Sequence, residues 1–389
     1  MRAVSESPIV TPRAWLHLGF MFPPRNVSRA AAAALRAVPN AALRLLGRQT
    51  SRDGFALAPD VRASALALSV IARDTADLDV EQARQEIESQ ATLAAGPPIP
   101  VGEVWDAHIA STPVRHYRPA HATGELPAVV YFHGGGWATG SLESHDNTCR
   151  FLCAYGDVAV ISVDYPLAPE HEFPAGLDAS DAVTSAVLAG EVDGIDPARV
   201  AFAGDSAGAT LSAALCLRRA ARGESQPTLQ VLIVPSTNLA TLDTPSQCEF
   251  DTGTYLTRKQ LEYYRELYTS ASDDLTNWEV SPSLAPPELL ARVAPAYIAA
   301  AGFDPLRDEA VTFARSLVDV GVHATVKVYD SLTHPFANAF YVWKDAAVAM
   351  HQIVGAVRFA LAVDELDPLG HDDPGGDVEQ HARQDASED

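Results

Sequence analysis

The chain of 389 residues is long enough to bury a large core, and we expect one main domain with appended segments rather than two equal domains. Its formal net charge of −22, from 28 basic and 50 acidic residues, argues against nucleic acid as the main partner, because phosphate binding requires clustered Lys and Arg. The charge is uneven: residues 1–52 contain eight Arg and a single acid, whereas residues 364–389 contain ten acids and one Arg.

Neither a targeting segment nor a metal site stands out in the sequence. The first residues lack the basic, apolar and small-residue order of a secretory signal, and no run of about 18 apolar residues indicates a membrane-spanning helix. We therefore expect a cytoplasmic protein. Cys149 and Cys153 are one helical turn apart, but no second pair or His cluster completes a tetrahedral metal site. We interpret these two and Cys216 and Cys248 as small buried apolar residues, and we expect no bound metal.

Residues 1–100 predict a helical segment that packs over the main domain as a cap. Ser28 can cap an Ala-rich run that ends before Pro39, and residues 41–48 and 81–94 also favour helix. The stretch Gly96–Pro100 ends the last helix and marks a boundary. The basic start of the segment also leaves open a helix that lies on a membrane surface, although packing on the protein is favoured.

From residue 101 the pattern changes to strands alternating with helices. Residues 104–109 and 114–117 predict a strand pair. Apolar runs typical of parallel strands buried on both faces follow at 128–132, 158–163, 200–203, 231–234 and 296–300, with a further strand at 325–329. Helical patterns separate them at 175–189, 207–221 and 308–320. This order predicts an α/β fold over 101–363, with a mostly parallel central sheet and helices on both faces, followed by a disordered acidic tail over 364–389.

The strongest motif is Gly204-Asp205-Ser206-Ala207-Gly208, which follows the apolar run at 200–203 and opens a helical pattern. This is the context that the G-x-S-x-G nucleophile turn requires. Side chains at the flanking positions would clash in so tight a turn, and Gly204 and Gly208 remove that clash. The turn is expected to expose the Ser206 hydroxyl near a helix N-terminus, which favours negative charge. Ser206 is therefore the candidate nucleophile.

A second motif, His133-Gly134-Gly135-Gly136-Trp137, follows the apolar run at 128–132. Consecutive Gly residues let the backbone approach a ligand and turn its N–H groups inward. The N–H groups of Gly134, Gly135 and Gly136 can hold an oxyanion together with that of Ala207. A phosphate-binding turn is the alternative, but no Lys-Ser/Thr pair follows the glycines. We interpret His133 as a loop anchor and not as a base.

A nucleophilic serine needs a base, and the base needs an orienting carboxylate. Asp304 follows the strand at 296–300, at the strand end where sites gather in parallel sheets. His334 follows the strand at 325–329, whereas His323 precedes it and His351 lies in a helical pattern. His334 is therefore the candidate base and Asp304 the candidate acid. Asp308 is the nearest rival acid, but we expect it to cap the next helix, a role that Asp304 could also have.

Together, four blocks in this order resemble the bacterial hormone-sensitive-lipase-like esterases of the α/β-hydrolase superfamily, over residues 100–355 with a looser match before them. The blocks are the glycine motif at 133–137, Asp164-Tyr165-Pro166-Leu167-Ala168-Pro169-Glu170-His171-Glu172-Phe173-Pro174-Ala175, the Ser206 motif, and Asp304-Pro305-Leu306-Arg307-Asp308-Glu309 with His334. The resemblance implies a triad of Ser206, Asp304 and His334. It also implies an oxyanion hole from Gly134, Gly135 or Gly136 with Ala207, and an N-terminal helical cap over the acyl pocket.

Two positions depart from that family, which usually has Arg at Pro166 and often a small residue at Pro335. The first change removes a structural salt bridge. The second restricts His334 toward extended conformations and could shift its ring slightly, without removing the base. We interpret residues 164–175 as a rigid loop that supports the glycine turn, with His171 as a hydrogen-bonded structural residue.

These residues predict a serine carboxylesterase that acts on a small-molecule ester and needs no metal or organic cofactor. The resemblance implies short to medium acyl chains and a homodimer joined through the strand at 325–329. Three alternatives stay open. An amidase or arylformamidase would use the same triad. A non-catalytic ligand receptor on this fold typically lacks the base, so His334 speaks against it. A surface-bound lipase is suggested only by the basic N-terminal segment.

Overall fold

The computed structural model describes residues 32–362, except residues 254 and 272. Within this range eight strands form one sheet in the order β1-β2-β4-β3-β5-β6-β7-β8. β2 is antiparallel to its neighbours β1 and β4, and β3 to β8 pair in parallel. This is the mostly parallel sheet that the sequence predicts. The strands are β1 (Glu103–Ile109), β2 (Thr112–Arg118), β3 (Leu126–Phe132), β4 (Ala159–Val163), β5 (Ile195–Asp205), β6 (Leu229–Ile233), β7 (Ala296–Phe303) and β8 (Ala324–Thr333).

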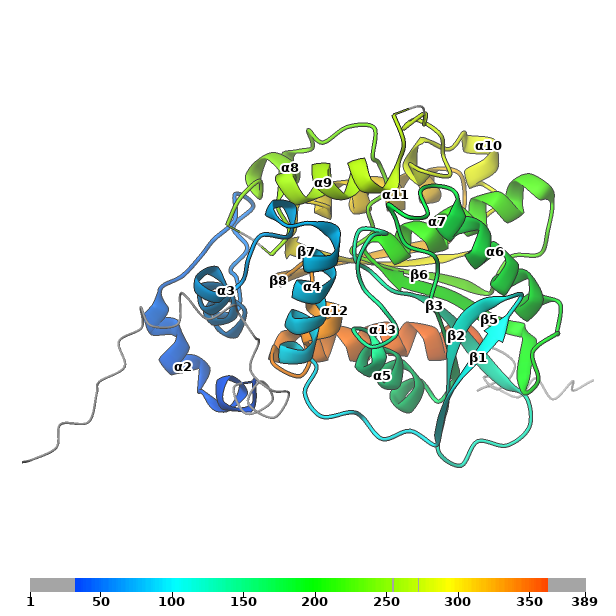
Figure 1. The fold of residues 1–389 in the computed structure, drawn as a ribbon, viewed down its shortest axis with the longest axis horizontal. Helices are drawn as coiled ribbons and strands as arrows, with labels where there is room; N and C mark the ends of the chain where they lie inside the picture. Colours follow the sequence, from blue (N-terminus) through cyan, green and yellow to red (C-terminus); the bar gives the residue numbers. More distant parts are fainter. Residues whose placement is uncertain (1–31, 254, 272, 363–389) are drawn as a thin grey trace, which may run out of the picture.

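Helices cover both faces of the sheet, as the sequence predicts (Figure 1). One face carries α6 (Ala175–Leu188), α7 (Ala207–Arg222) and α11 (Arg307–Asp319). The other carries α5 (Asp146–Gly156) and α13 (Lys344–Leu361). No helix in the described part of the chain is long and apolar enough to cross a bilayer. β8 forms one edge of the sheet, and the homodimer contact through this strand stays a prediction.

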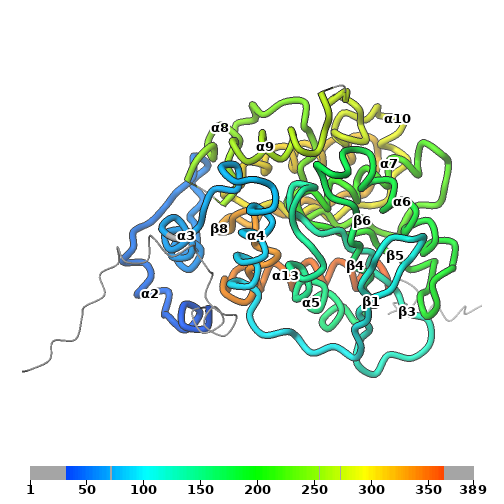
Figure 2. Tube along the Cα trace, in the orientation of Figure 1, coloured from blue at the N-terminus to red at the C-terminus, as the bar shows by residue number. Residues whose placement is uncertain are grey.

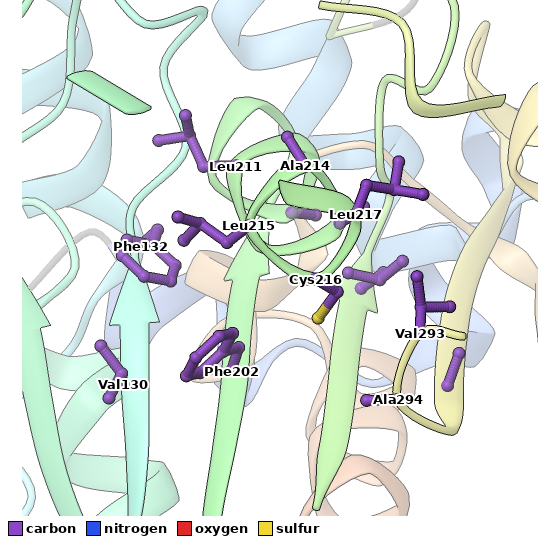
Figure 3. Close-up of a cluster of buried hydrophobic side chains, with 14 of the residues drawn as sticks. Val130, Phe132, Phe202, Leu211, Ala214, Leu215, Cys216, Leu217, Val293 and Ala294 are labelled. Atoms are coloured by element: carbon purple, nitrogen blue, oxygen red, sulfur yellow. The ribbon is translucent and has the colours of Figure 1, made fainter. Parts of the chain in front are cut away.

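The inner strands β3, β4, β6 and β7 are mainly apolar because each one faces a buried layer on both sides. Along β3, Val130 and Phe132 pack into the layer under α7, while Val129 and Tyr131 pack into the layer under α13. Figure 3 shows the first of these layers, with side chains of α7 lying over the two phenylalanines of β3 and β5. Each fully buried side chain of this size contributes about 1.5–3 kcal/mol. The core therefore fixes the position of α7 on the sheet.

The segment before β1 is helical and lies beside the carboxyl edge of the sheet (Figure 2). It contains α2 (Asn40–Leu43), η2 (Arg44–Leu46), α3 (Pro59–Ile71), η3 (Thr75–Asp77) and α4 (Val80–Ala94), after helical residues 32–37. Ser64 and Asp60 of α3 accept hydrogen bonds from the Trp343 ring and the Lys344 N–H at the start of α13. The Ser28 cap and the acidic tail lie outside the described residues, and the division of the chain near residue 100 stays a prediction.

A second group of short helices lies between β6 and β7 and meets the N-terminal segment. It consists of α8 (Pro245–Glu249), α9 (Arg258–Tyr268), η4 (Pro282–Leu284) and α10 (Pro287–Leu290). The Tyr264 hydroxyl of α9 donates to the Thr75 hydroxyl of η3 across 3.2 Å. The N-terminal segment and this group of helices are far apart in the sequence, yet they lie together over the edge of the sheet where the parallel strands end (Figure 1). We call this shared cover the roof.

Ser206 lies on a sharp turn between β5 and α7, with φ 53° and ψ −121°. This backbone conformation is uncommon for a residue with a Cβ. The turn is closely packed: a Cβ on Gly204 would collide with the backbone of Gly208, and one on Gly208 would collide with the carbonyl of Phe132. Glycine is thus required at both positions, for the steric reason that the sequence motif suggests.

Gly208→Ala tests this packing directly. The new methyl group has to displace the end of β3, so we expect the free energy of unfolding to fall by about 1–3 kcal/mol. Gly355→Ala in α13 is the matched control, because a Cβ there meets no heavy atom within 4 Å. That change is expected to stabilise the protein by about 0.5–1 kcal/mol. Urea unfolding measures both values, and a Gly208→Ala protein as stable as the wild type would refute the account of the turn.

Candidate active site

Three polar side chains from different strand ends form a continuous series of hydrogen bonds. The Ser206 hydroxyl, which follows β5, lies 2.9 Å from His334 Nε2, and His334 follows β8. His334 Nδ1 lies 2.8 Å from Asp304 Oδ2, and Asp304 follows β7. Asp304 is fully buried, and its other oxygen accepts the N–H of Leu306 at 2.9 Å. The sequence predicts these three residues, and the structure brings them together.

The series has the geometry that proton transfer from serine requires. Both distances lie within the range of about 2.6–3.2 Å in which a base can take a proton. The buried carboxylate of Asp304 fixes the imidazole ring, so that the nitrogen that faces Ser206 is Nε2. Pro335 follows directly and forms the N-cap of α12 (Phe336–Ala339). His334 keeps both contacts with this proline beside it.

Backbone N–H groups face the same site. Those of Gly135, Gly136 and Ala207 have no acceptor among the residues that the structure describes, and all three residues line the cavity beside Ser206. The N–H of Gly134 instead donates to Asp205 Oδ1 at 3.0 Å. Because a residue has only one N–H, Gly134 is not free to bind an oxyanion. This corrects the sequence-based assignment of Gly134 as a donor.

The roof over the site explains why the glycine turn tolerates no side chain. Gly136 has φ 59°, and a Cβ there would collide with the ring of Tyr264 in α9. Trp137 comes next, with its ring stacked on Tyr268 at a centroid distance of 4.3 Å. Arg84 of α4 donates to the carbonyl of Ala138 at 2.9 Å. The helices on both sides of the roof therefore hold the turn against the edge of the sheet.

His133 anchors this turn from beneath. Its ring is fully buried and stacks on Tyr165 at 4.3 Å, and the Tyr165 hydroxyl donates to the His133 carbonyl at 2.7 Å. Burial, and then the charge of His145, lower the pKa of His133 to about 4. His133 is therefore neutral at pH 7. The N–H of Ala168 also donates to the Trp137 carbonyl at 2.9 Å, so the loop at 164–175 supports the turn as expected.

Asp205 is a buried carboxylate directly before Ser206. Its Oδ1 accepts from the Tyr131 hydroxyl at 2.6 Å as well as from Gly134, and its Oδ2 lies 3.2 Å from His145 Nε2. Burial alone would raise the pKa of Asp205, but the charge and hydrogen bond of His145 and the hydrogen bond of Tyr131 outweigh it. The pKa of Asp205 falls to about 2, so this side chain is ionised at all ordinary pH values.

Ser206 opens into a cavity of about 450 Å³ beneath the roof. Its walls come from α3, from α9 and from the loop at 236–242, with apolar contributions from residues such as Leu68, Leu239 and Leu261. This volume is typical of pockets for small organic molecules. The site thus combines a serine, a base, free N–H donors and space for a small ligand.

A family model described as alpha/beta hydrolase fold matches residues 129–338, more than half of the chain. The chain belongs to the alpha/beta hydrolase family. This agrees with the resemblance that the four sequence blocks indicate.

Named relatives of the hydrolase match most of its length. Carboxylic ester hydrolase LipN of Mycobacterium tuberculosis (strain ATCC 25618 / H37Rv) is 38% identical over 342 residues, which cover 84% of this chain and 89% of the relative. Ethyl acetate hydrolase of Pseudomonas putida is 34% identical over 290 residues, covering 72% and 90%. The solved structure of the hyperthermophilic esterase from the archaeon Pyrobaculum calidifontis is 34% identical, with a TM-score of 0.73, and the match covers 78% of this chain and 98% of that one.

Three smaller expectations for the hydrolase are wrong. Asp308 does not cap α11, whose N-cap is Leu306; its carboxylate instead accepts from the N–H of Ser246 at 2.8 Å and from the Arg307 guanidinium at 3.0 Å. The side chain of His171, expected to be hydrogen-bonded, is exposed and takes part in none of the hydrogen bonds among the described residues. Cys248 is exposed, whereas the other three cysteines are buried as expected.

Sequence reasoning also missed four residues that shape the site of this hydrolase: Arg84, His145, Tyr264 and Asn338. Each reaches its partner across a long sequence separation, so no local motif marks it. Asn338 is the nearest of the four to a predicted residue, because it lies on α12, four positions after His334.

The low pKa of Asp205 predicts how stability depends on pH in this hydrolase. A carboxylate with a lowered pKa in the folded state stabilises fully above its unfolded value, here near 3.8, and loses this contribution as the pH falls toward 2. Urea unfolding of the wild type and Asp205→Asn at pH 7, 5, 4 and 3 measures the difference. We expect the stability advantage of the wild type to be constant from pH 7 to 5 and to shrink below pH 4. A constant advantage down to pH 3 would contradict the lowered pKa.

Proposed function

We propose that this hydrolase is a serine carboxylesterase in which Ser206 is the nucleophile, His334 the base and Asp304 the carboxylate that orients the base. The proposal rests on the unbroken series of hydrogen bonds from Asp304 through His334 to Ser206, which opens into a cavity with unoccupied N–H donors. The ester hydrolases among its relatives support a carboxylic ester as the substrate class.

The first half of the reaction forms an acyl-enzyme. His334 Nε2 takes the proton from the Ser206 hydroxyl as its oxygen attacks the ester carbonyl, and Asp304 stabilises the imidazolium that results. The negative charge on the carbonyl oxygen is met by the N–H groups of Gly135, Gly136 and Ala207. His334 then gives its proton to the alcohol oxygen, and the alcohol leaves with the acyl group on Ser206.

The second half returns the enzyme to its starting state. The departed alcohol leaves space beside His334 for a water molecule, which loses a proton to Nε2 as it attacks the acyl carbonyl. The same N–H groups hold the second oxyanion. The proton then passes from His334 to Ser206 as the carboxylic acid is released. One imidazole thus serves as base and acid in both halves.

The size of the cavity supports short to medium acyl chains. About 450 Å³ has to hold the acyl group and the alcohol together, and the wall residues Leu68, Leu239 and Leu261 favour an apolar chain. An amidase or arylformamidase would use the same residues, and the ester-hydrolysing relatives favour the ester. A non-catalytic receptor has no use for a base held 2.9 Å from a serine.

A p-nitrophenyl ester series from acetate to palmitate tests the function and the acyl preference together. We expect the highest kcat/KM between butyrate and octanoate, and a fall in kcat/KM of about tenfold or more by palmitate.

Matched p-nitroanilides test the amidase alternative, and sedimentation with anionic vesicles at low salt tests the surface-bound lipase. An inactive wild type, or a Ser206→Ala protein with full activity, would end the proposal.

Asp304→Asn and Asp308→Asn separate the orienting carboxylate from its neighbour. Replacing Asp304 leaves an amide that favours the wrong imidazole tautomer, so we expect kcat to fall by about 10⁴-fold. Asp308 is the matched control, because its carboxylate contacts Ser246 and Arg307 but not His334. Its variant is expected to keep kcat within about threefold. Equal losses in the two variants would reverse the assignment of Asp304.

A further inference from the structure

A buried polar cluster behind the glycine turn joins the three segments that the proposed reaction uses. It contains Asp205 beside the nucleophile, Gly134 of the glycine turn, and Asn338, four residues after the base. His145 lies between them, at the N-terminus of α5, and is 3% exposed. No step of the proposed mechanism uses His145 or Asn338, although His145 is buried, Asn338 is partly buried, and both line the cavity beside Ser206.

His145 is the link within this cluster. Its Nε2 lies 3.2 Å from Asp205 Oδ2 and 2.8 Å from the side-chain amide of Asn338. Its Nδ1 lies 2.9 Å from the Ser144 hydroxyl. His145 Nε2 therefore approaches both Asp205, the last residue of β5, and Asn338 on α12, the helix directly after His334 and Pro335.

The hydrogen atoms of the cluster can be assigned from its own contacts. The structure places Asn338 Nδ2 toward His145 and Asn338 Oδ1 2.5 Å from the Thr148 hydroxyl, which also lies 3.0 Å from the Ala337 carbonyl. The Thr148 hydroxyl has only one hydrogen to donate, so it cannot serve both oxygens. Turning the Asn338 amide over, so that its nitrogen and oxygen exchange places, satisfies all contacts: Thr148 donates to the Ala337 carbonyl, and the Asn338 nitrogen donates to Thr148. The Asn338 oxygen then faces His145, so Nε2 carries a hydrogen that Asp205 and Asn338 share.

With this assignment the cluster becomes one directed series. His145 donates to Asp205, and Asp205 accepts the N–H of Gly134. The series is bonded to the glycine turn through the Gly134 N–H. The turn contains three residues without side chains, so its backbone has little rigidity of its own. The position of the Asp205 carboxylate therefore sets the position of the glycine turn. It thereby sets the distance of the Gly135 and Gly136 N–H groups from Ser206.

We infer that His145 and Asn338 are positioning residues that, through Asp205 and Gly134, hold the oxyanion-binding turn in register with the segment that carries His334. The inference rests on the proposed function, because it concerns the alignment of the N–H donors with the base during acyl transfer. A displaced donor weakens binding of the transition state more than binding of the neutral ester. The effect of the two residues is therefore expected in kcat and not in KM.

His145→Phe and His145→Gln separate the hydrogen bond from the shape of the ring. Phenylalanine retains a planar ring but has no donor for Asp205, whereas the glutamine amide can reach the position of Nε2. We expect kcat for p-nitrophenyl butyrate to fall by about 10- to 100-fold in His145→Phe, with KM changed less than about threefold. His145→Gln is expected to recover most of the loss. His351→Phe is the control, because that ring contacts Phe151 and Tyr155 and lies outside the cluster.

Asn338→Leu is the second variant, and it leaves His145 and Asp205 intact in case His145→Phe fails to fold. It is expected to lower kcat in the same way by a smaller factor. Amide hydrogen exchange of Gly134 supplies a readout that does not depend on activity. We expect faster exchange at Gly134 in His145→Phe and Asn338→Leu than in the wild type, with unchanged exchange in the core of β6.

Three results would overturn the inference: a folded His145→Phe protein with wild-type kcat, an equal loss in His145→Gln and His145→Phe, or a loss confined to KM. Unchanged Gly134 exchange in both His145→Phe and Asn338→Leu would do the same. Wild type and Ser206→Ala are assayed beside them. If the wild type itself has no esterase activity, the proposed function fails, and the exchange rates of Gly134 still report whether the cluster holds the turn.

Discussion

The close approach of α7 to the end of β3 is the constraint on which the rest of the site depends. Gly204 and Gly208 allow this approach, since a side chain at either position would collide with neighbouring backbone. β3 leads into the glycine turn and β5 leads into Ser206, so this one contact fixes the turn beside the serine. The core beneath α7 supplies the packing that holds the strained serine in place.

A buried negative charge reinforces this contact. Asp205 lies between the turn and the nucleophile, and it is held there by Tyr131, His145 and the Gly134 N–H. These donors offset the cost of burying the carboxylate, whereas the loss of one donor would leave its charge poorly compensated. The same arrangement engages the Gly134 N–H, so one glycine of the motif supports the turn while its two successors line the cavity.

Local features of the sequence predict the sheet, the helices on its two faces and the serine turn. Parallel strands buried on both faces give continuous apolar runs, and the G-x-S-x-G pattern carries its own steric reason. Asp304 and His334 are predictable because each follows a strand, and the carboxyl ends of parallel strands meet at one edge. The order of the motifs along the chain then selects them from other Asp and His residues.

The remaining features depend on contacts between distant residues. Whether Gly134 is a free donor is decided by Asp205, 71 residues away, and the tight roof over Gly136 is decided by Tyr264. Asp308 has the sequence context of a helix cap, yet its carboxylate is taken by Ser246. His171 and Cys248 are exposed, which their neighbours in the sequence do not reveal. Residue type and spacing identify candidates, and tertiary packing assigns their roles.

The central claim is that Ser206 is the nucleophile and is activated by His334. Labelling with an organophosphate, followed by peptide mass spectrometry, measures this most directly. The account predicts one phosphoryl group per chain, located on Ser206, at a rate that falls by at least about 100-fold in His334→Ala. Label on a different residue, or an unchanged labelling rate in the His334 variant, would contradict it.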